Sequence, residues 1–143
     1  MVLDRGNLGG YTGPASHNTY GANPNAVQTL LIWPGINPHD QAGVWGGPAY
    51  YGGLHGAFLY YCGNGTTLTA FAFHNGTFTP ATVGGNPNQS TDKFPGEGGT
   101  TPVVSSNAET PGTAVVWAVA RRHGSGEVSV RAYDATTLPI RFL

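Results

Sequence analysis

Short runs of apolar and aromatic residues, interrupted by Gly, Asn and Pro, recur along the chain from about residue 44. Each run has the length of a β-strand and is bounded by turn-forming residues. The first series predicts strands over residues 46–51, 57–61, 67–73 and 78–83. The Asn-Gly dipeptides at 64–65 and 75–76 are of the kind that close β-hairpins. This part of the chain is therefore predicted to form one antiparallel unit.

The same order of strands returns after residues 84–99, a segment rich in Gly, Pro, Asn and Ser that we expect to be a loop. The second series predicts strands over 101–105, 114–120 and 127–133, followed by a turn at 134–137. Ala70-Phe71 and Ala132-Tyr133 align at a spacing of 62 (132 minus 70), and Pro48 and Pro102 at 54 (102 minus 48). Loop insertions explain the difference, and the two units share one plan.

The N-terminal part of the chain carries fewer strand signals. Residues 1–4 resemble the end of a strand, and residues 5–25 are expected to form a long polar loop. Residues 26–33 form a strand candidate, and 34–41 break it with Pro-Gly and Asn-Pro. Leu3-Asp4 followed by Asn7-Leu8 parallels the Tyr133-Asp134 turn. We therefore expect the end of a preceding unit here, so that the repeat continues beyond both ends of the chain.

Composition supports strands and turns rather than helices. Gly (23) and Pro (11) are frequent, only 9% of the residues are charged, and strong helix formers are scarce. Disorder is disfavoured because 39% of the residues are apolar and the net charge is −1. The chain is therefore predicted to be an all-β protein.

Repeated units of three to four strands are typical of a β-propeller, in which each unit is one antiparallel blade. We predict an all-β propeller segment of about two four-stranded antiparallel blades. Residues 1–43 form the end of one blade and a connecting loop, 44–99 form a blade, and 100–143 form a blade and the start of the next. Because a ring needs about four to eight blades, we expect outer faces with uncovered apolar residues. A small β-sandwich, whose two sheets cover one another, is the alternative fold.

The segment Ala132-Tyr133-Asp134-Ala135-Thr136-Thr137-Leu138 resembles the A-x-D-x-x-T-G-x-x-x-W repeat of pyrroloquinoline-quinone (PQQ) propellers. Leu138 stands at the Gly position and Phe142 at the Trp position. In this motif the Asp and Thr bond the turn backbone and the aromatic residue packs between blades. Weaker copies lie at Ala70, with Ala72 for the Asp and Pro80 for the Trp, and near Asp4.

Longer segments of the sequence are also similar to the PQQ-like repeat region of large bacterial proteins; they include VWGGPAYYGG, FPGEGGTTPVVSSN and VRAYDATTL. This resemblance covers almost the whole chain and implies a larger, exported protein with more blades. Quinoprotein dehydrogenases of this kind carry a catalytic Asp, a Ca²⁺ site of Glu, Asn and Asp, and adjacent cysteines. Neither Asp92 nor Glu97 matches that calcium site, and Cys62 has no adjacent partner. We therefore assign no catalytic, cofactor-binding or metal residue.

The other motifs do not indicate a metal-binding, catalytic or nucleotide-binding site. The five histidines (His17, His39, His55, His74 and His123) show no short ligand spacing, and only Asp40 adjoins one of them. His123-Gly124-Ser125-Gly126 lacks the nucleophile pattern of hydrolases, and Gly96-Glu97-Gly98-Gly99 lacks the context of a nucleotide-binding loop. The lone Cys62 is expected to be a buried thiol.

The charge pattern and hydropathy bear on partners. Arg121-Arg122 is the only basic pair, so no nucleic-acid or anionic-membrane partner is expected. No run of about 20 apolar residues predicts a membrane span. The N-terminal residues lack the order of a signal peptide, so any export signal is expected elsewhere or absent.

Two further patterns concern the surface. Asn64, Asn75 and Asn88 begin triplets that match the glycosylation acceptor pattern, although such triplets also arise from turn chemistry. Tyr50, Tyr51, Tyr60 and Tyr61 could stack on sugar rings, although strand alternation puts half of them in the core.

We predict a non-catalytic scaffold or interaction segment that binds other propeller blades or other copies of the chain. The alternatives are a part of a PQQ-dependent dehydrogenase and a carbohydrate-binding module.

Overall fold

The computed structural model of the chain describes residues 2–3, 26–28, 30, 46–54, 56–95, 98–108, 110–121 and 126–142. These residues form antiparallel β-strands and turns, and no helix occurs among them. The strands are β1 (Val2–Leu3), β2 (Ala26–Gln28), β3 (Ala49–Gly53), β4 (Gly56–Tyr61), β5 (Thr67–His74), β6 (Thr77–Pro80), β7 (Thr82–Val83), β8 (Asn86–Pro87), β9 (Gln89–Lys93), β10 (Val103–Ser105), β11 (Val115–Arg121) and β12 (Val128–Asp134). The predicted all-β, antiparallel class is confirmed.

The first large sheet has the strand order β3-β4-β5-β6, and β9 also pairs with β5. Strand β6 pairs with β5 through Phe71↔Pro80, and β9 continues on the same side of β5 through Thr69↔Gln89. The short β7–β8 hairpin lies between them in the sequence. The outermost strand of this sheet is thus one strand interrupted by a hairpin.

The turn between β5 and β6 shows how the sequence fixes the local structure. Asn75 and Gly76 both have positive φ angles, 49° and 81°. Such angles match the type of tight turn that suits the twist of paired strands, and Asn-Gly is its preferred sequence. The predicted hairpin at 75–76 is confirmed.

The second large sheet has the order β10-β11-β12, with every pair antiparallel. Arg141 forms an isolated bridge with Tyr133 on the free side of β12. The C-terminal residues therefore pair with the edge of β12 that corresponds to the edge of β5 covered by β6 and β9 in the first sheet.

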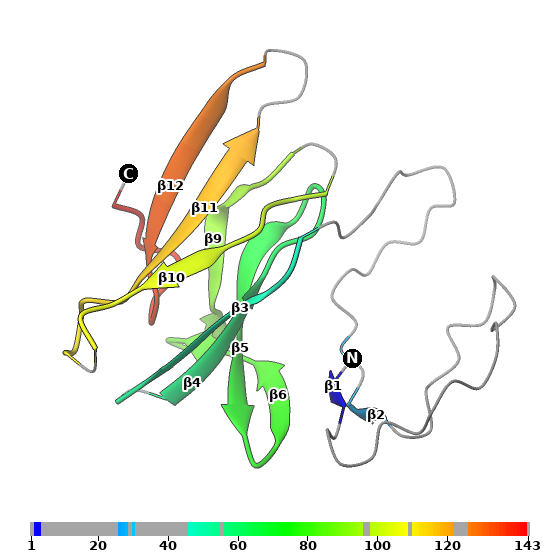
Figure 1. The fold of residues 1–143 in the computed structure, drawn as a ribbon, viewed down its shortest axis with the longest axis vertical. Helices are drawn as coiled ribbons and strands as arrows, with labels where there is room; N and C mark the ends of the chain where they lie inside the picture. Colours follow the sequence, from blue (N-terminus) through cyan, green and yellow to red (C-terminus); the bar gives the residue numbers. More distant parts are fainter. Residues whose placement is uncertain are drawn as a thin grey trace, which may run out of the picture.

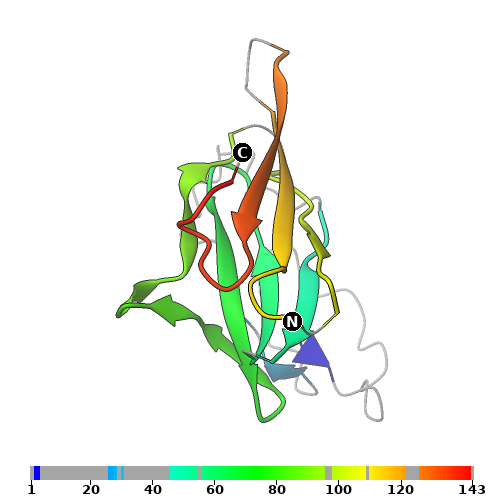
Figure 2. The same cartoon turned by 90° about the vertical axis from the view of Figure 1, so that its left-hand side faces the viewer.

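The two large sheets lie one over the other (Figures 1 and 2). The apolar core lies between them. Alternation along each strand decides which side chains enter this core, because successive residues of a strand point to opposite faces. The first sheet contributes Tyr60, Leu68 and Ala70, and the second contributes Val116, Ala118 and Tyr133. Phe94, which follows β9, is also fully buried and packs near Tyr133.

The linker from the first sheet to the second passes very close to the first. Gly99 has a φ angle of +68°, and a Cβ atom at this position would lie 2.5 Å from the carbonyl carbon of Gly63. Only glycine tolerates both conditions without strain. Gly99 in this glycine-rich linker is therefore explained by close packing against the first sheet rather than by nucleotide binding.

One sequence-based prediction is wrong. Residues 84–99 were expected to form a loop, but β8 and β9 lie within this range. Strand β9 reads Gln-Ser-Thr-Asp-Lys, so it lacks the apolar alternation that signals a strand. An outermost strand needs few apolar side chains because it buries little surface, and hydrogen bonds to β5 hold it in place.

The N-terminal strands β1 and β2 pair with one another, and β2 lies near β6. The Gln28 side chain accepts a hydrogen bond from the Phe78 backbone N–H at 2.7 Å and donates one to the Phe78 carbonyl at 2.5 Å. The strand predicted over 26–33 is present at Ala26–Gln28. Most of its remaining residues, and the predicted loop at 5–25, lie outside the described residues.

Candidate functional site

The face of the β10-β11-β12 sheet that points away from the first sheet is largely apolar, with Arg121 beside Val128 at one end. Along β11, Val116, Ala118 and Ala120 are buried in the core, so Trp117 and Val119 point outward. Cross-strand pairing places Val103 beside Trp117 and Val130 beside Val119. We call Val103, Trp117, Val119, Val128 and Val130 the outward face.

The side chains of this outward face are exposed to solvent. The four valines are between 48% and 63% exposed, and Trp117 is 36% exposed. Monomeric soluble proteins rarely expose large contiguous apolar patches, and such patches commonly mark interaction sites. The outward face is therefore the strongest candidate for a functional surface among the residues that the structure describes.

The C-terminal residues extend this apolar surface. The bridge between Tyr133 and Arg141 sets a register in which Phe142 lies opposite Ala132, and the Phe142 N–H donates to the Ala132 carbonyl at 2.7 Å. Phe142, at the position of the motif's Trp, is 52% exposed and Ile140 is 51% exposed. The packing between blades that the motif implies for this aromatic residue is not made within the described chain.

The turn after β12 has the chemistry that the motif predicts. The Asp134 Oδ1 atom accepts hydrogen bonds from the Thr136 N–H at 2.8 Å, the Thr136 hydroxyl at 2.6 Å and the Thr137 N–H at 2.9 Å. An Asp side chain that bonds backbone groups two and three residues ahead stabilises a turn. Asp134 is therefore a turn acceptor, as expected, while Asp4 lies outside the described residues.

Two side chains of the first sheet hold this turn against it. Asn88 is 1% exposed; its Oδ1 atom accepts from the Leu138 N–H at 2.9 Å, and its Nδ2 atom donates to the Thr136 carbonyl at 3.0 Å. The Tyr60 hydroxyl donates to the Ala135 carbonyl at 2.6 Å. These three bonds join the two sheets through buried backbone groups that would otherwise have no partner.

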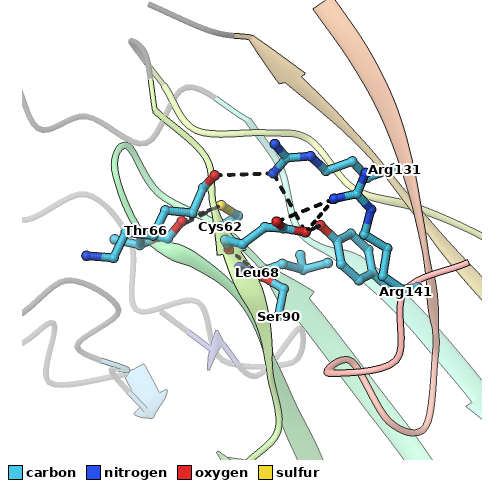
Figure 3. Close-up of polar contacts among 9 residues, drawn as sticks. Cys62, Thr66, Leu68, Ser90, Arg131 and Arg141 are labelled. Atoms are coloured by element: carbon cyan, nitrogen blue, oxygen red, sulfur yellow. Dashed lines mark hydrogen bonds and ion pairs between the residues drawn. The ribbon is translucent and has the colours of Figure 1, made fainter. Parts of the chain in front are cut away.

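A cluster of charged and polar groups lies at the edge between β9 and β12 (Figure 3). The Tyr133 hydroxyl donates to the Asp92 Oδ2 atom at 2.9 Å, and the Arg141 Nη1 atom lies 3.2 Å from the same oxygen. The Arg131 Nη1 atom donates to the Lys93 carbonyl at 3.3 Å, and its guanidinium lies over the Phe94 ring. Asp92 is thus engaged in protein contacts, which gives no support to a calcium-binding role.

Burial controls the titration of the core tyrosines. Burial raises the pKa of Tyr133 to about 12, and the hydrogen bond to the Asp92 carboxylate adds to this effect. Burial also raises the pKa of Tyr60, with smaller contributions from Tyr51 and Asp134. Both hydroxyl groups therefore act as neutral hydrogen-bond donors.

Cys62 is 1% exposed and its Sγ atom lies 3.8 Å from the Thr66 hydroxyl (Figure 3). Burial raises the pKa of this thiol, although the hydrogen bond between the thiol and the Thr66 side chain acts in the opposite direction. A buried and protonated thiol is a poor nucleophile. The prediction of a buried cysteine is confirmed.

Most of the other candidate residues lie outside the part of the chain that the structure describes. His74 is exposed at the end of β5, while His17, His39, Asp40, His55, Glu97 and His123–Ser125 lie outside the described residues. Within the described ranges, no three His, Cys, Asp or Glu side chains gather as a metal site requires. A helix long and apolar enough to cross a membrane is likewise absent from these ranges.

The tyrosines and the glycosylation-type triplets named from the sequence differ in how far they are buried. Tyr50 is 58% exposed, whereas Tyr60 and Tyr61 are buried and Tyr51 is partly buried, so a row of four sugar-stacking rings does not form. Asn75 lies exposed at a hairpin tip, while Asn88 is buried and bonded to the Asp134 turn. The triplet at Asn88 therefore has a structural role.

Sequence reasoning missed Asn88 and Ser90, which are buried polar residues of a segment predicted to be a loop. No apolar alternation indicates a strand there, because hydrogen bonds to β5 rather than buried apolar side chains specify β9. The sequence matches no model of a protein family, no curated protein and no solved structure.

Proposed function

We propose that this chain is a non-catalytic scaffold segment of a β-propeller in a larger, exported bacterial protein of the PQQ-like repeat type. Its task is to present the outward face of the β10-β11-β12 sheet to the sheet of a neighbouring blade. The observation that carries the proposal is the row of exposed valines and Trp117 on an otherwise well-packed sheet.

The repeated arrangement supports a propeller. Each large sheet is antiparallel and has its strands in sequence order, and the two sheets are packed face to face. Blades of a propeller pack in the same way, each covering one face of the next. A further blade on the outward face would continue the stack that the two sheets begin.

The turn chemistry supports the same proposal. The Asp134 turn of the second sheet is held by Asn88 and Tyr60 of the first, so neighbouring sheets are joined by polar bonds as well as apolar packing. Phe142 is 52% exposed and is available to a following blade. A repeating connection of this kind is what a scaffold of stacked sheets needs.

A charged substitution on the outward face tests the proposal. We expect the wild-type chain to bind an environment-sensitive dye such as anilinonaphthalene sulfonate, because the dye inserts into exposed apolar surface. Val119→Lys puts a charge at the centre of this surface and is expected to reduce the dye fluorescence strongly. Thr82→Lys adds the same charge at an exposed position of β7 and is the matched control.

Both variants should keep the wild-type midpoint of thermal unfolding, because surface substitutions usually change stability by less than about 0.5 kcal/mol. Equal dye fluorescence in wild type and Val119→Lys would contradict the proposal. A thermal midpoint raised by PQQ with Ca²⁺ would instead favour the dehydrogenase alternative.

A further inference from the structure

The sequence contains two Asn-Gly dipeptides, and both lie in turns of the first sheet. Asn64-Gly65 precedes β5, and Asn75-Gly76 joins β5 to β6. In each dipeptide the side-chain amide of the Asn is followed by a glycine nitrogen, which no Cβ atom shields. The two sites have the same local chemistry, so any difference in their reactivity must come from the fold.

The dipeptide at the tip of the β5–β6 hairpin is open to water. Asn75 and Gly76 are both exposed, and the tip lies at the lower end of the first sheet in Figure 1. Strand pairing ends at His74↔Thr77, where the Thr77 hydroxyl donates to the His74 carbonyl at 3.0 Å. Within the described part of the chain, no group bonds the Gly76 N–H or the Asn75 side chain. Both groups are therefore accessible to solvent.

The other dipeptide is held by backbone pairing. The Gly65 N–H donates to the carbonyl of the buried Phe94 at 2.9 Å, and the Phe94 N–H donates to the Thr66 carbonyl at 2.9 Å. Asn64 is partly buried and makes an interaction of its own. The nitrogen of Gly65 is therefore engaged between the turn and the segment that follows β9.

The backbone of the hairpin tip permits a local rearrangement. The φ angles of Asn75 and Gly76, 49° and 81°, match a type I′ turn, which has positive φ at both central residues. Type II′ keeps the positive φ of the first central residue and differs by a rotation of the peptide group between the two. Both types close two-residue hairpins. The Gly76 nitrogen can therefore turn toward the Asn75 side chain while β5 and β6 stay paired.

We propose that Asn75 is a site of spontaneous deamidation in the folded chain. The Gly76 nitrogen loses its proton to a base in solution and attacks the Asn75 Cγ atom. A bond forms between these two atoms, the bond from Cγ to Nδ2 breaks, and Nδ2 takes up a proton and leaves as ammonia. One water molecule then opens the cyclic imide at either carbonyl, which yields aspartate or isoaspartate. The net change is one water consumed and one ammonia released, with no oxidation or reduction.

Both products alter the tip of the hairpin. Each carries a carboxylate where the amide stood, which adds a negative charge to a chain whose net charge is −1. Isoaspartate also adds a carbon atom to the backbone between positions 75 and 76. The reaction uses neither the outward face nor a neighbouring blade, so the inference goes beyond the proposed function.

The two dipeptides provide an internal comparison. The wild-type chain is incubated at mildly alkaline pH, and aspartate and isoaspartate at each position are measured by protease digestion and mass spectrometry with electron-transfer fragmentation. We expect Asn75 to convert at least about fivefold faster than Asn64, which is the factor that one hydrogen bond of typical net strength accounts for. In denaturant, where the Gly65–Phe94 bond is absent, we expect the two positions to convert at about equal rates.

A matched pair of variants assigns the released ammonia. Asn75→Asp and Asn64→Asp each remove one reactive amide, and Asp is accepted in turns as readily as Asn. We expect Asn75→Asp to abolish most of the early ammonia release from the folded chain and Asn64→Asp to leave it unchanged. An unchanged midpoint of thermal unfolding, recorded before and after incubation, verifies that the chain reacts in its folded state.

The outcomes separate this inference from the proposed function. Val119→Lys, which alters the outward face, should convert at Asn75 at the wild-type rate. Equal rates at Asn64 and Asn75 in the folded chain, or no conversion of Asn75, would overturn the inference. Neither result would change the dye binding or the solution mass by which the proposed function is judged.

Discussion

Tyr133 connects the core to the charged cluster at the edge of the sheets. Its side chain is fully buried, and its hydroxyl reaches the Asp92 carboxylate at 2.9 Å. A neutral hydroxyl donates this bond, whereas a phenolate would face the carboxylate as a like charge. The folded state therefore holds the Tyr133 proton to higher pH than the unfolded chain does.

The sign of the pH effect follows from proton binding. The unfolded chain releases the Tyr133 proton near pH 10.0, while the folded chain holds it until about pH 12. Between these values the folded state binds more protons, so the free energy of unfolding falls as the pH rises. This contribution is fully present below pH 10.0 and is lost as the pH rises through the folded pKa.

Chemical denaturation of wild type and Tyr133→Phe at about pH 8 and about pH 11 measures this effect. We expect wild type to lose more free energy of unfolding between the two pH values than the variant loses. Equal losses in the two proteins would show that Tyr133 does not titrate differently in the folded and unfolded states.

The residue scale also shows what sequence reasoning can reach. Asp134 and Thr136 form a short pattern with its own chemistry, so their turn was predicted and is confirmed. Asn88 acts on a turn about 50 residues away, and nothing near it in the sequence indicates that partner. Exposed and buried Asn residues look alike in a segment rich in Asn, Gly and Pro.

At the scale of elements, the β8–β9 segment joins the two sheets. Asn88 lies between β8 and β9 and bonds both a donor and an acceptor of the Asp134 turn. Removal of its side chain would leave the buried Leu138 N–H and the Thr136 carbonyl without these partners. Each buried and unpaired group costs about 1–3 kcal/mol.

We expect Asn88→Ala to lower the free energy of unfolding by about 2–4 kcal/mol, as measured by chemical denaturation. Asn86→Ala is the matched control, because Asn86 is exposed on β8, and its effect should stay below about 0.5 kcal/mol. Similar losses in the two variants would contradict the role given to Asn88.

The elements differ in how well the sequence predicts them. Strands β4, β5, β11 and β12 were predicted within one or two residues because their apolar residues recur with a strand period or fill a buried run. Strand β9 was missed because hydrogen bonds to β5, rather than apolar burial, specify it. Long-range pairing of this kind leaves almost no local signal.

At the scale of the whole molecule, the two sheets pack through their inner faces, so each sheet covers one face of the other. The inner face of the β10-β11-β12 sheet is buried against the first sheet, while its outward face carries exposed valines and Trp117. The sequence predicted uncovered apolar surface from the number of repeats, and this sheet shows it. Which residues form the surface follows from the register of β11 and β12, which composition alone does not fix.

Burial of the apolar outward face would favour self-association of the isolated chain. Apolar surface removed from water contributes about 25 cal/mol per Å², and a second copy can cover the face when no neighbouring blade is present. Association by this route depends on protein concentration, since it follows mass action.

The mass of the wild-type chain in solution, measured by sedimentation equilibrium over a range of concentrations, tests the central claim most directly. Our account predicts a mass that rises above the 14.8 kDa of a single chain as the concentration increases. A soluble and cooperatively unfolding chain that stays at 14.8 kDa at every concentration would contradict it, and would favour a closed β-domain.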